Sequence, residues 1–241
     1  MSAKIQRLDK VLSNSGYGTR KEVKKIIKQG SVMVNNSVVL DVGTKVDPET
    51  DIIEVAGRTL DYKANIYIML NKPSGVLSTT YDKTETTVID LLYGEYSHRD
   101  LFPVGRLDID TEGLVLLTDD GQLAHRLLSP KNMVPKLYYV EVNGRLDEQD
   151  VSAFNAGICL GDFTTLSSEL EILQAGDKST ALVKIYEGKF HQIKRMMQAR
   201  NKEVVYLKRL SIGPLELDED LDLGQWRELT CEEISLLQKY V

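Results

Sequence analysis

The first part of the chain has apolar residues at the spacing of two short helices. One group lies at positions i, i+3 and i+4 and shares a single helical face: Leu8, Val11 and Leu12. Thr19 and Glu22 have the spacing of a capping box, which predicts that a second helix begins there. The inner face of this helix is apolar: Val23, Ile26 and Ile27. Gly30 is expected to end it, because glycine tolerates the backbone that follows a last helical turn.

After Gly30, the apolar runs 32–34 and 38–39 predict two short strands, and residues 46–48 and 52–55 complete a small α+β unit. The first two flank Asn35 and Asn36, which tolerate the positive φ of a tight hairpin turn. A short polar stretch follows these strands, so we expect a domain boundary near residue 63. The prediction is a first domain of residues 1–62 and a second domain of residues 63–241.

In the second part, apolar or alternating runs predict strands at residues 66–70, 114–118, 136–142 and 181–186, with further strand segments within residues 201–213 and 223–230. The polar segment 78–100 predicts a loop with one short helix around residues 88–92. A helix is expected after Gly188, because its inner face is apolar: Ile193, Met196 and Met197. Thr230 and Glu233 repeat the capping-box spacing, which predicts a final short helix.

Length and composition restrict the class of protein. At 241 residues and 42% hydrophobic content, the chain can form a packed core in one or two domains. Cys159 and Cys231 lie far apart, so we expect neither a disulfide framework nor a cysteine zinc site. The first residues lack the apolar run of a signal peptide, and no apolar window approaches the ~20 residues of a membrane helix. These features predict a soluble, cytoplasmic protein without a membrane partner.

Charge is segregated along the chain, although the net charge is -6. Residues 1–30 and residues 184–209 each carry eight Lys and Arg against two acids, whereas residues 216–233 carry eight acids against one arginine. Five cations lie on the outer sides of the second predicted helix: Arg20, Lys21, Lys24, Lys25 and Lys28. Such cations repel one another at i, i+4, and RNA phosphates relieve the repulsion. We therefore favour an RNA-binding surface over a merely solvated helix.

The most informative stretch is Gly-Arg-Leu-Asp at residues 105–108, which continues through Asp110 and Glu112 into an apolar strand. A rigid strand that delivers a reachable loop is a common place for a catalytic group. If the loop is locally extended, Arg106 and Asp108 project on the same side. The alternative for Arg106 is a salt bridge to Asp110 or Glu112.

The carboxylates of this stretch also approach the spacing of a calcium loop. That interpretation is disfavoured, because Leu116 replaces a polar ligand, Asp119 is too short for bidentate reach and neither flank predicts a helix. A plain structural loop in which Asp108 caps backbone amides is a second alternative. The three histidines have no ligand spacing, so we expect no metal site.

Several segments together resemble the RsuA-type family of ribosomal RNA pseudouridine synthases. They are Gly-Arg-Leu-Asp at residues 105–108, Lys-x-Tyr at 136–138, Lys-Pro-x-Gly at 72–75 and the run from Gly188 to Met196. The first 60 residues resemble the small S-four RNA-binding domain, through Arg-Leu-Asp-Lys-Val-Leu at 7–12 and Thr-Arg-Lys-Glu-Val at 19–23. The resemblance implies an α+β fold, in which this RNA-binding domain precedes a catalytic domain with a mixed, mostly antiparallel sheet flanked by helices.

The resemblance also implies a role for each candidate residue. Asp108 would be the catalytic carboxylate, Lys194 the cation paired with it, and Tyr138 the aromatic residue that holds the flipped base. Arg106 would hold the flipped nucleotide or fill its vacated place. Further contacts to RNA are expected at Lys72, Arg195, Arg209 and Arg7, with bracing of the loop as the alternative for Arg209. For His191 we prefer a hydrogen bond that fixes the loop over a role as general base.

The implied function is site-specific conversion of uridine to pseudouridine in ribosomal RNA. The reaction has no redox step and no group donor, so no cofactor is expected. Small-subunit RNA is preferred as the substrate, because the residues after Arg106 look most like that branch; large-subunit RNA is the alternative. The expected partner is ribosomal RNA or an assembling ribosomal subunit, and the protein is expected to be a monomer. A non-catalytic RNA-binding assembly factor is the rival from another class.

Overall fold

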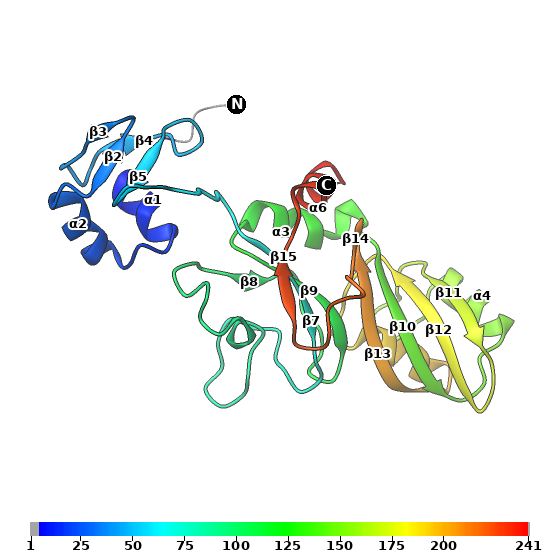
Figure 1. Ribbon diagram of the computed structural model, residues 1–241. Helices are drawn as coiled ribbons and strands as arrows, with labels where there is room; N and C mark the ends of the chain where they lie inside the picture. Colours follow the sequence, from blue (N-terminus) through cyan, green and yellow to red (C-terminus); the bar gives the residue numbers. More distant parts are fainter. Residues whose placement is uncertain (1–4, 241) are drawn as a thin grey trace. The chain divides into compact units, whose positions relative to one another are not determined.

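The computed structural model describes residues 5–240, which divide into two compact units (Figure 1). The first unit extends to Asn65 and includes Gly94–Asp100; the second contains Ile66–Tyr93 and the chain from Leu101 onward. Gly94–Asp100 lie in the stretch that we assigned to the second domain. They belong with the first unit because the Arg99 guanidinium donates hydrogen bonds to the carbonyl oxygens of Lys63 and Ala64.

The first unit contains the two predicted helices, α1 (Leu8–Asn14) and α2 (Arg20–Lys28). The capping box at the start of α2 is present, with Thr19 and Glu22 each accepting a hydrogen bond from the other's backbone. The predicted hairpin is formed by β2 (Val32–Val34) and β3 (Ser37–Val38), and Asn35 and Asn36 both have positive φ. Local turn and cap chemistry therefore predicted this unit correctly.

The other strands of the first unit are short. β2 also pairs with β5 (Ile53–Val55), which pairs with β6 (Arg58–Thr59), so the strand order of this sheet is β3-β2-β5-β6. A separate pair joins β1 (Gln6–Arg7) to β4 (Lys45–Val46). Both helices bury their apolar faces in one core with these strands, and this core includes Leu8, Val23 and Ile27.

The second unit is built on one nine-stranded sheet with the order β11-β12-β10-β13-β9-β7-β15, to which β14 and β8 are attached (Figure 1). All of its pairings are antiparallel except that of β13 with β9, which confirms the predicted mixed, mostly antiparallel sheet. The strands are β7 (Tyr67–Lys72), β8 (Phe102–Pro103), β9 (Glu112–Thr118), β10 (Lys136–Asn143), β11 (Glu169–Gln174), β12 (Lys178–Ile185), β13 (Glu203–Ile212), β14 (Leu215–Glu216) and β15 (Trp226–Glu228).

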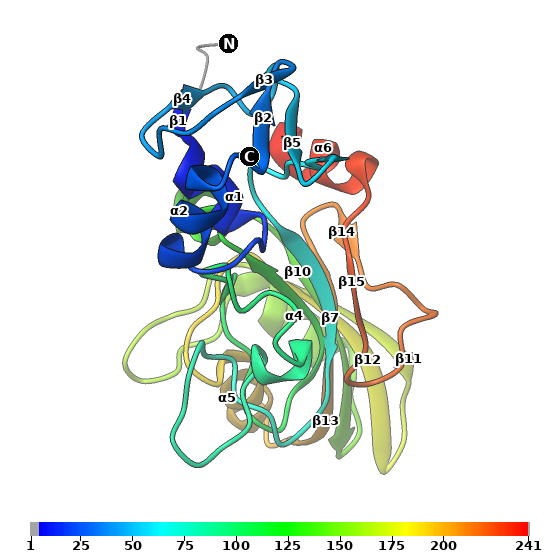
Figure 2. The same ribbon diagram turned by 60° about the vertical axis from the view of Figure 1, so that its left-hand side comes forward.

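Helices cover this sheet, and some of them were not predicted. α5 (Gln192–Ala199) and α6 (Cys231–Tyr240) were expected, whereas α3 (Gly121–Leu128) and α4 (Glu148–Ala156) were missed. The short helix expected around residues 88–92 is a single 3-10 turn, η1 (Asp90–Leu92), and a second one is η2 (Pro130–Asn132). α4 packs against β11 (Figure 1), and α5 packs against β13 (Figure 2). None of the helices in the described part of the chain has the length and apolar character of a membrane span.

The core of the second unit holds β9 rigidly in the middle of the sheet. β7 is buried along its whole length, and β9 is buried from Gly113 to Thr118. One face of both strands packs with α3 and α6 in a single apolar cluster. The parallel pairing of β9 with β13 depends on Gly113, because a Cβ there would lie 2.3 Å from the Arg209 carbonyl oxygen. The loop that precedes β9 therefore has a fixed base.

Candidate active site

The loop before β9 carries Asp108 and is held by buried hydrogen bonds. The Thr111 amide donates to the Asp108 carbonyl oxygen at 3.1 Å, which closes a turn. The Lys72 ammonium donates to the carbonyl oxygens of Ile109 (3.1 Å) and Thr111 (2.8 Å), and the Leu107 amide donates to the Ser78 hydroxyl (3.1 Å). These contacts hold the loop in one conformation, so the position of the Asp108 carboxylate is set before any substrate binds.

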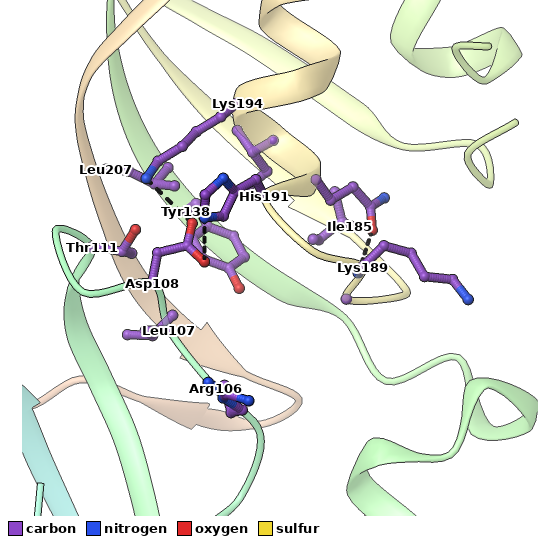
Figure 3. Close-up of a pocket in the computed structure, with 13 residues that line it drawn as sticks. Arg106, Leu107, Asp108, Thr111, Tyr138, Ile185, Lys189, His191, Lys194 and Leu207 are labelled. Atoms are coloured by element: carbon purple, nitrogen blue, oxygen red, sulfur yellow. Dashed lines mark hydrogen bonds and ion pairs between the residues drawn. The ribbon is translucent and has the colours of Figure 1, made fainter. Parts of the chain in front are cut away.

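Two basic side chains from the start of α5 approach Asp108 (Figure 3). Lys194 Nζ lies 3.3 Å from Asp108 Oδ2, and His191 Nε2 lies 3.6 Å from Asp108 Oδ1. Lys194 also donates a hydrogen bond to Asp110 Oδ1 at 2.5 Å, and this bond lowers the pKa of Asp110. The structure thus brings together the expected pair of Asp108 and Lys194, and it adds Asp110, which sequence reasoning did not include.

Asp108, His191 and Lys194 line a pocket that also contains Tyr138 and Arg106 (Figure 3). Tyr138 is buried on the pocket side of β10, whereas Tyr139 points to the opposite face and packs edge-on against Tyr206. Arg106 is exposed at the pocket, apart from the pair of Asp108 and Lys194. In the described part of the chain it forms no ion pair with Asp110, which binds Lys194, or with Glu112, which accepts a hydrogen bond from Tyr206.

Gln192, which sequence reasoning overlooked, holds the turn that leads into α5. Its amide oxygen accepts a hydrogen bond from the Lys189 backbone at 2.9 Å, and its amide nitrogen donates to Glu187 at 3.0 Å. We expected His191 to fix this loop by a hydrogen bond. Instead, the His191 side chain makes no capping hydrogen bond, and its ring stacks on Phe190. The sequence contained a signal for this role of Gln192, because the residue follows the turn at Gly188 and begins an amphipathic helix.

Two of the cations expected to contact RNA are buried, and we correct both expectations. Lys72 has no exposed surface, and its ammonium donates to three carbonyl oxygens, those of Pro73, Ile109 and Thr111. Burial lowers the pKa of Lys72 to about 8. Arg209 is 3% exposed and donates to the Leu114 carbonyl oxygen, so it braces β9. Neither side chain can reach a phosphate, because both are buried inside the second unit.

The other expected RNA contacts lie at the surface. Arg195 is partly exposed, but it donates to Asp162 and to the Leu160 carbonyl oxygen and lies over the Phe163 ring. Arg7 is exposed and binds Asp9 through two hydrogen bonds of 3.0 Å. The α2 cations are all exposed: Arg20, Lys21, Lys24, Lys25 and Lys28. The α2 surface is thus accessible to a polyanion.

The chemistry available at the pocket is that of one carboxylate beside a cation. Within residues 5–240, no group of three or more His, Cys, Asp or Glu side chains is placed to hold a metal ion. The Asp108 carboxylate has an ammonium within ion-pair distance on one side and the Tyr138 ring in the same pocket. An ionised carboxylate, a cation and an aromatic ring can together bind a planar base and act on the sugar attached to it.

Comparison with known proteins identifies the family. The sequence profile described as RNA pseudouridylate synthase matches residues 66–199, and that of the S4 domain matches residues 6–52. The chain is 49% identical over 235 residues to an uncharacterized RNA pseudouridine synthase, YtzG, of Bacillus subtilis, covering 97% of this chain and 98% of the relative. It is 40% identical over 235 residues to ribosomal small subunit pseudouridine synthase A of Vibrio cholerae (97% and 100% covered).

Two further comparisons bear on substrate and fold. Ribosomal large subunit pseudouridine synthase B of Bacillus subtilis is 35% identical over 237 residues, covering 97% of this chain and 96% of the relative. A crystal structure described as a pseudouridylate synthase matches with a TM-score of 0.67 at 36% identity, covering 96% of this chain and 99% of that one. With the profile match over more than half of its length, the chain belongs to the RNA pseudouridylate synthase family and is a pseudouridine synthase.

Proposed function

We propose that this protein converts specific uridines of ribosomal RNA to pseudouridine, with Asp108 as the catalytic carboxylate. The observation that supports this assignment is the pocket in which Asp108 lies 3.3 Å from Lys194 and shares the lining with Tyr138. Lys194 stabilises the charged form of the carboxylate, and the Tyr138 ring holds the flipped base by stacking. Arg106, at the edge of the same pocket, holds the flipped nucleotide or fills the place it leaves.

The reaction is an isomerisation that balances without another reactant. The N1–C1′ bond breaks, the base turns within the pocket and a C5–C1′ bond forms. The proton on C5 leaves and N1 takes up a proton. Asp108 can serve as a nucleophile at C1′ or as a base at the ribose, and both roles use the same ionised oxygen. No redox step or group donor enters, so the proposed reaction requires no cofactor.

The preferred substrate is small-subunit ribosomal RNA. The support is the higher identity to the small-subunit synthase (40%) than to the large-subunit synthase (35%), together with the residues that follow Arg106. Because the two identities are close, large-subunit RNA remains the alternative substrate. In this proposal the exposed cations of α2 dock the RNA through its phosphates.

We further propose that the protein acts as a cytoplasmic monomer on ribosomal RNA or on an assembling ribosomal subunit. A purely non-catalytic assembly factor is disfavoured, because such a protein has no need to keep Asp108, Tyr138 and Lys194 together in one pocket. The boundary near residue 63 belongs to the same proposal, with the RNA-binding function in residues 1–62 and the catalytic function in residues 63–241.

The test is Asp108→Asn, which keeps the shape of the side chain and removes its charge. Ribosomal RNA labelled with tritium at C5 of uridine is taken from cells that lack the protein, and release of tritium is measured. We expect Asp108→Asn to abolish release, because the lost reacting group has no substitute in the pocket. RNA affinity should stay within about twofold. Asp110→Asn is the matched control, because Asp110 also binds Lys194, and it should retain release. Equal release by Asp108→Asn and the parent would refute the assignment, and mapping pseudouridine in the same RNA identifies the subunit.

A further inference from the structure

Phe190 is an aromatic side chain that the fold leaves in solvent, between the pocket-lining residues Lys189 and His191 in the chain. The residue is 77% exposed, and its ring is stacked on His191 with 3.8 Å between ring centroids and 16° between planes. Burying a phenylalanine stabilises a protein by about 1.5–3 kcal/mol, and at this exposure Phe190 contributes little of that. Single exposed apolar residues are common, so the surroundings of Phe190 decide whether it has a use.

The turn that presents Phe190 is held in place on both sides. On one side the buried Gln192 side chain binds the Lys189 amide and the Glu187 carboxylate. On the other, His191 has the left-handed conformation (φ 50°), and its carbonyl oxygen accepts a hydrogen bond from the Arg195 amide at 2.9 Å. The exposed ring therefore stands on an ordered turn at the start of α5, which reduces the entropy lost when it stacks on a ligand.

The stack formed by Phe190 and His191 leads directly to the catalytic carboxylate. His191 Nε2 lies 3.6 Å from Asp108 Oδ1, so the two rings extend outward from the atom that acts on the ribose (Figure 3 shows His191 beside Asp108). Lys189 and Arg106, both exposed, belong to the same pocket lining. An aromatic face flanked by cations is the arrangement that binds single-stranded RNA, because bases stack and phosphates pair with the charges.

We propose that the Phe190–His191 stack is a platform for an unpaired base next to the target uridine in the RNA. This inference rests on the proposed RNA substrate and deepens it, since it names a contact outside the uridine pocket. One face of the Phe190 ring is covered by the imidazole, and the flanking base stacks on the other. The contact holds the neighbouring nucleotide while the uridine is turned out of its own stack, and it tolerates any base because every base has a π face.

The first test measures steady-state tritium release with Phe190 variants of the full-length protein. A stacking contact is worth about a 5- to 150-fold change in affinity, so Phe190→Ala should raise KM by that factor and leave kcat within about twofold. Phe190→Tyr keeps the π face and should match the parent. Phe190→Leu keeps the apolar surface without the π face, and it should resemble the alanine variant.

The matched control is Tyr81→Ala, which removes an aromatic residue of the same unit that is 73% exposed and, unlike Phe190, has no pocket-lining residue next to it in the chain. Its KM should equal that of the parent. The inference is overturned if Phe190→Ala has the parent's KM, if Phe190→Leu restores binding fully, or if Tyr81→Ala produces an equal loss.

A second measurement separates this inference from the proposed function. Asp108→Asn protein is mixed with a short single-stranded RNA that contains one uridine and 2-aminopurine on either side of it. The fluorescence of 2-aminopurine changes when the base stacks, so the signal should change with Asp108→Asn protein and not with Asp108→Asn protein that also carries Phe190→Ala. If the parent releases no tritium from any ribosomal RNA, the proposed function is wrong. The fluorescence signal still shows in that case whether a base stacks on Phe190. An identical signal from both proteins removes the platform even where tritium release is normal.

Discussion

Replacement of Lys194 by methionine removes the cation beside Asp108 and keeps an unbranched side chain of similar length. The two charges lie 3.3 Å apart, and their side chains are 23% and 25% exposed. At that distance an effective dielectric constant of about 20 gives an attraction of about 5 kcal/mol. Lys194 also binds Asp110 at 2.5 Å, and solvent reaches both groups, so the attraction that holds Lys194 beside the Asp108 carboxylate is reduced to about 2–3 kcal/mol.

This energy predicts the size of the kinetic defect. If this attraction holds the carboxylate in its reactive position, Lys194→Met should lower kcat by about 30- to 160-fold. The KM for RNA should change little, because Lys194 binds carboxylates of the protein in this structure. Lys194→Arg keeps the charge with a different geometry and should recover part of the rate.

The assay is tritium release under saturating and limiting RNA, with circular dichroism and thermal unfolding to show that each variant is folded. A defect confined to KM, with a weaker dependence of binding on salt, would mean that Lys194 binds an RNA phosphate. A folded Lys194→Met protein with the parent's kcat would refute the argument that the ion pair with Lys194 supports the reaction at Asp108.

Two further predictions concern RNA docking and the buried lysine. Changing four exposed lysines of α2 to glutamine should weaken RNA binding and reduce the slope of log K against log salt by up to about 3: Lys21, Lys24, Lys25 and Lys28. For Lys72, burial lowers the pKa from 10.5 to about 8, so between these pH values the unfolded chain binds more protons than the folded protein. The unfolding free energy of the parent, relative to Lys72→Met, should therefore rise by up to about 3 kcal/mol from pH 8 to pH 10.5.

Both predictions, for the α2 lysines and for Lys72, can be checked directly. A set of four exposed lysines elsewhere serves as the charge-matched control for α2: Lys83, Lys131, Lys178 and Lys239. An equal loss of slope in both sets would exclude α2 as the specific docking surface. For Lys72, denaturant titrations of both proteins at several pH values give the difference directly. A difference that stays flat or falls across this range would mean that burial does not disfavour the charged form.

Local rules predicted the elements whose determinants are close together in sequence. The capping box of Thr19 and Glu22 and the turn at Asn35 and Asn36 are examples, because each depends on residues two to four positions apart. The start of α4 was missed although its cap has the same reciprocal form, because Asp147 and Asp150 replace the Thr and Glu pair. Helix α4 also buries a single apolar residue, Phe154, so no apolar period marks it in the sequence.

The site was predicted better than its surroundings. The motifs identified the residues that meet in the pocket, Asp108, Tyr138 and Lys194. The assignment of Lys72 to RNA was wrong, and for Arg209 the structure agrees with the bracing alternative. A lysine or arginine in sequence gives no sign that its partners are backbone carbonyls. The partners of Lys72 include Thr111, 39 positions later, and the partner of Arg209 is Leu114, 95 positions earlier. Such partners are defined only by the assembled sheet.

The parallel contact between β9 and β13 is short, with only Lys208 opposite Glu112 and Arg209 opposite Gly113. The loop that carries Asp108 leads into β9, on one side of this contact. Tyr138 on β10 and Lys194 on α5 lie on the other side, because β10 and α5 both pack with β13. Reacting groups displaced by about 1 Å can lose a hundredfold in rate. Substitutions in the contact between β9 and β13 can therefore lower the rate without touching the substrate. An inactivating substitution in this protein need not lie in the pocket.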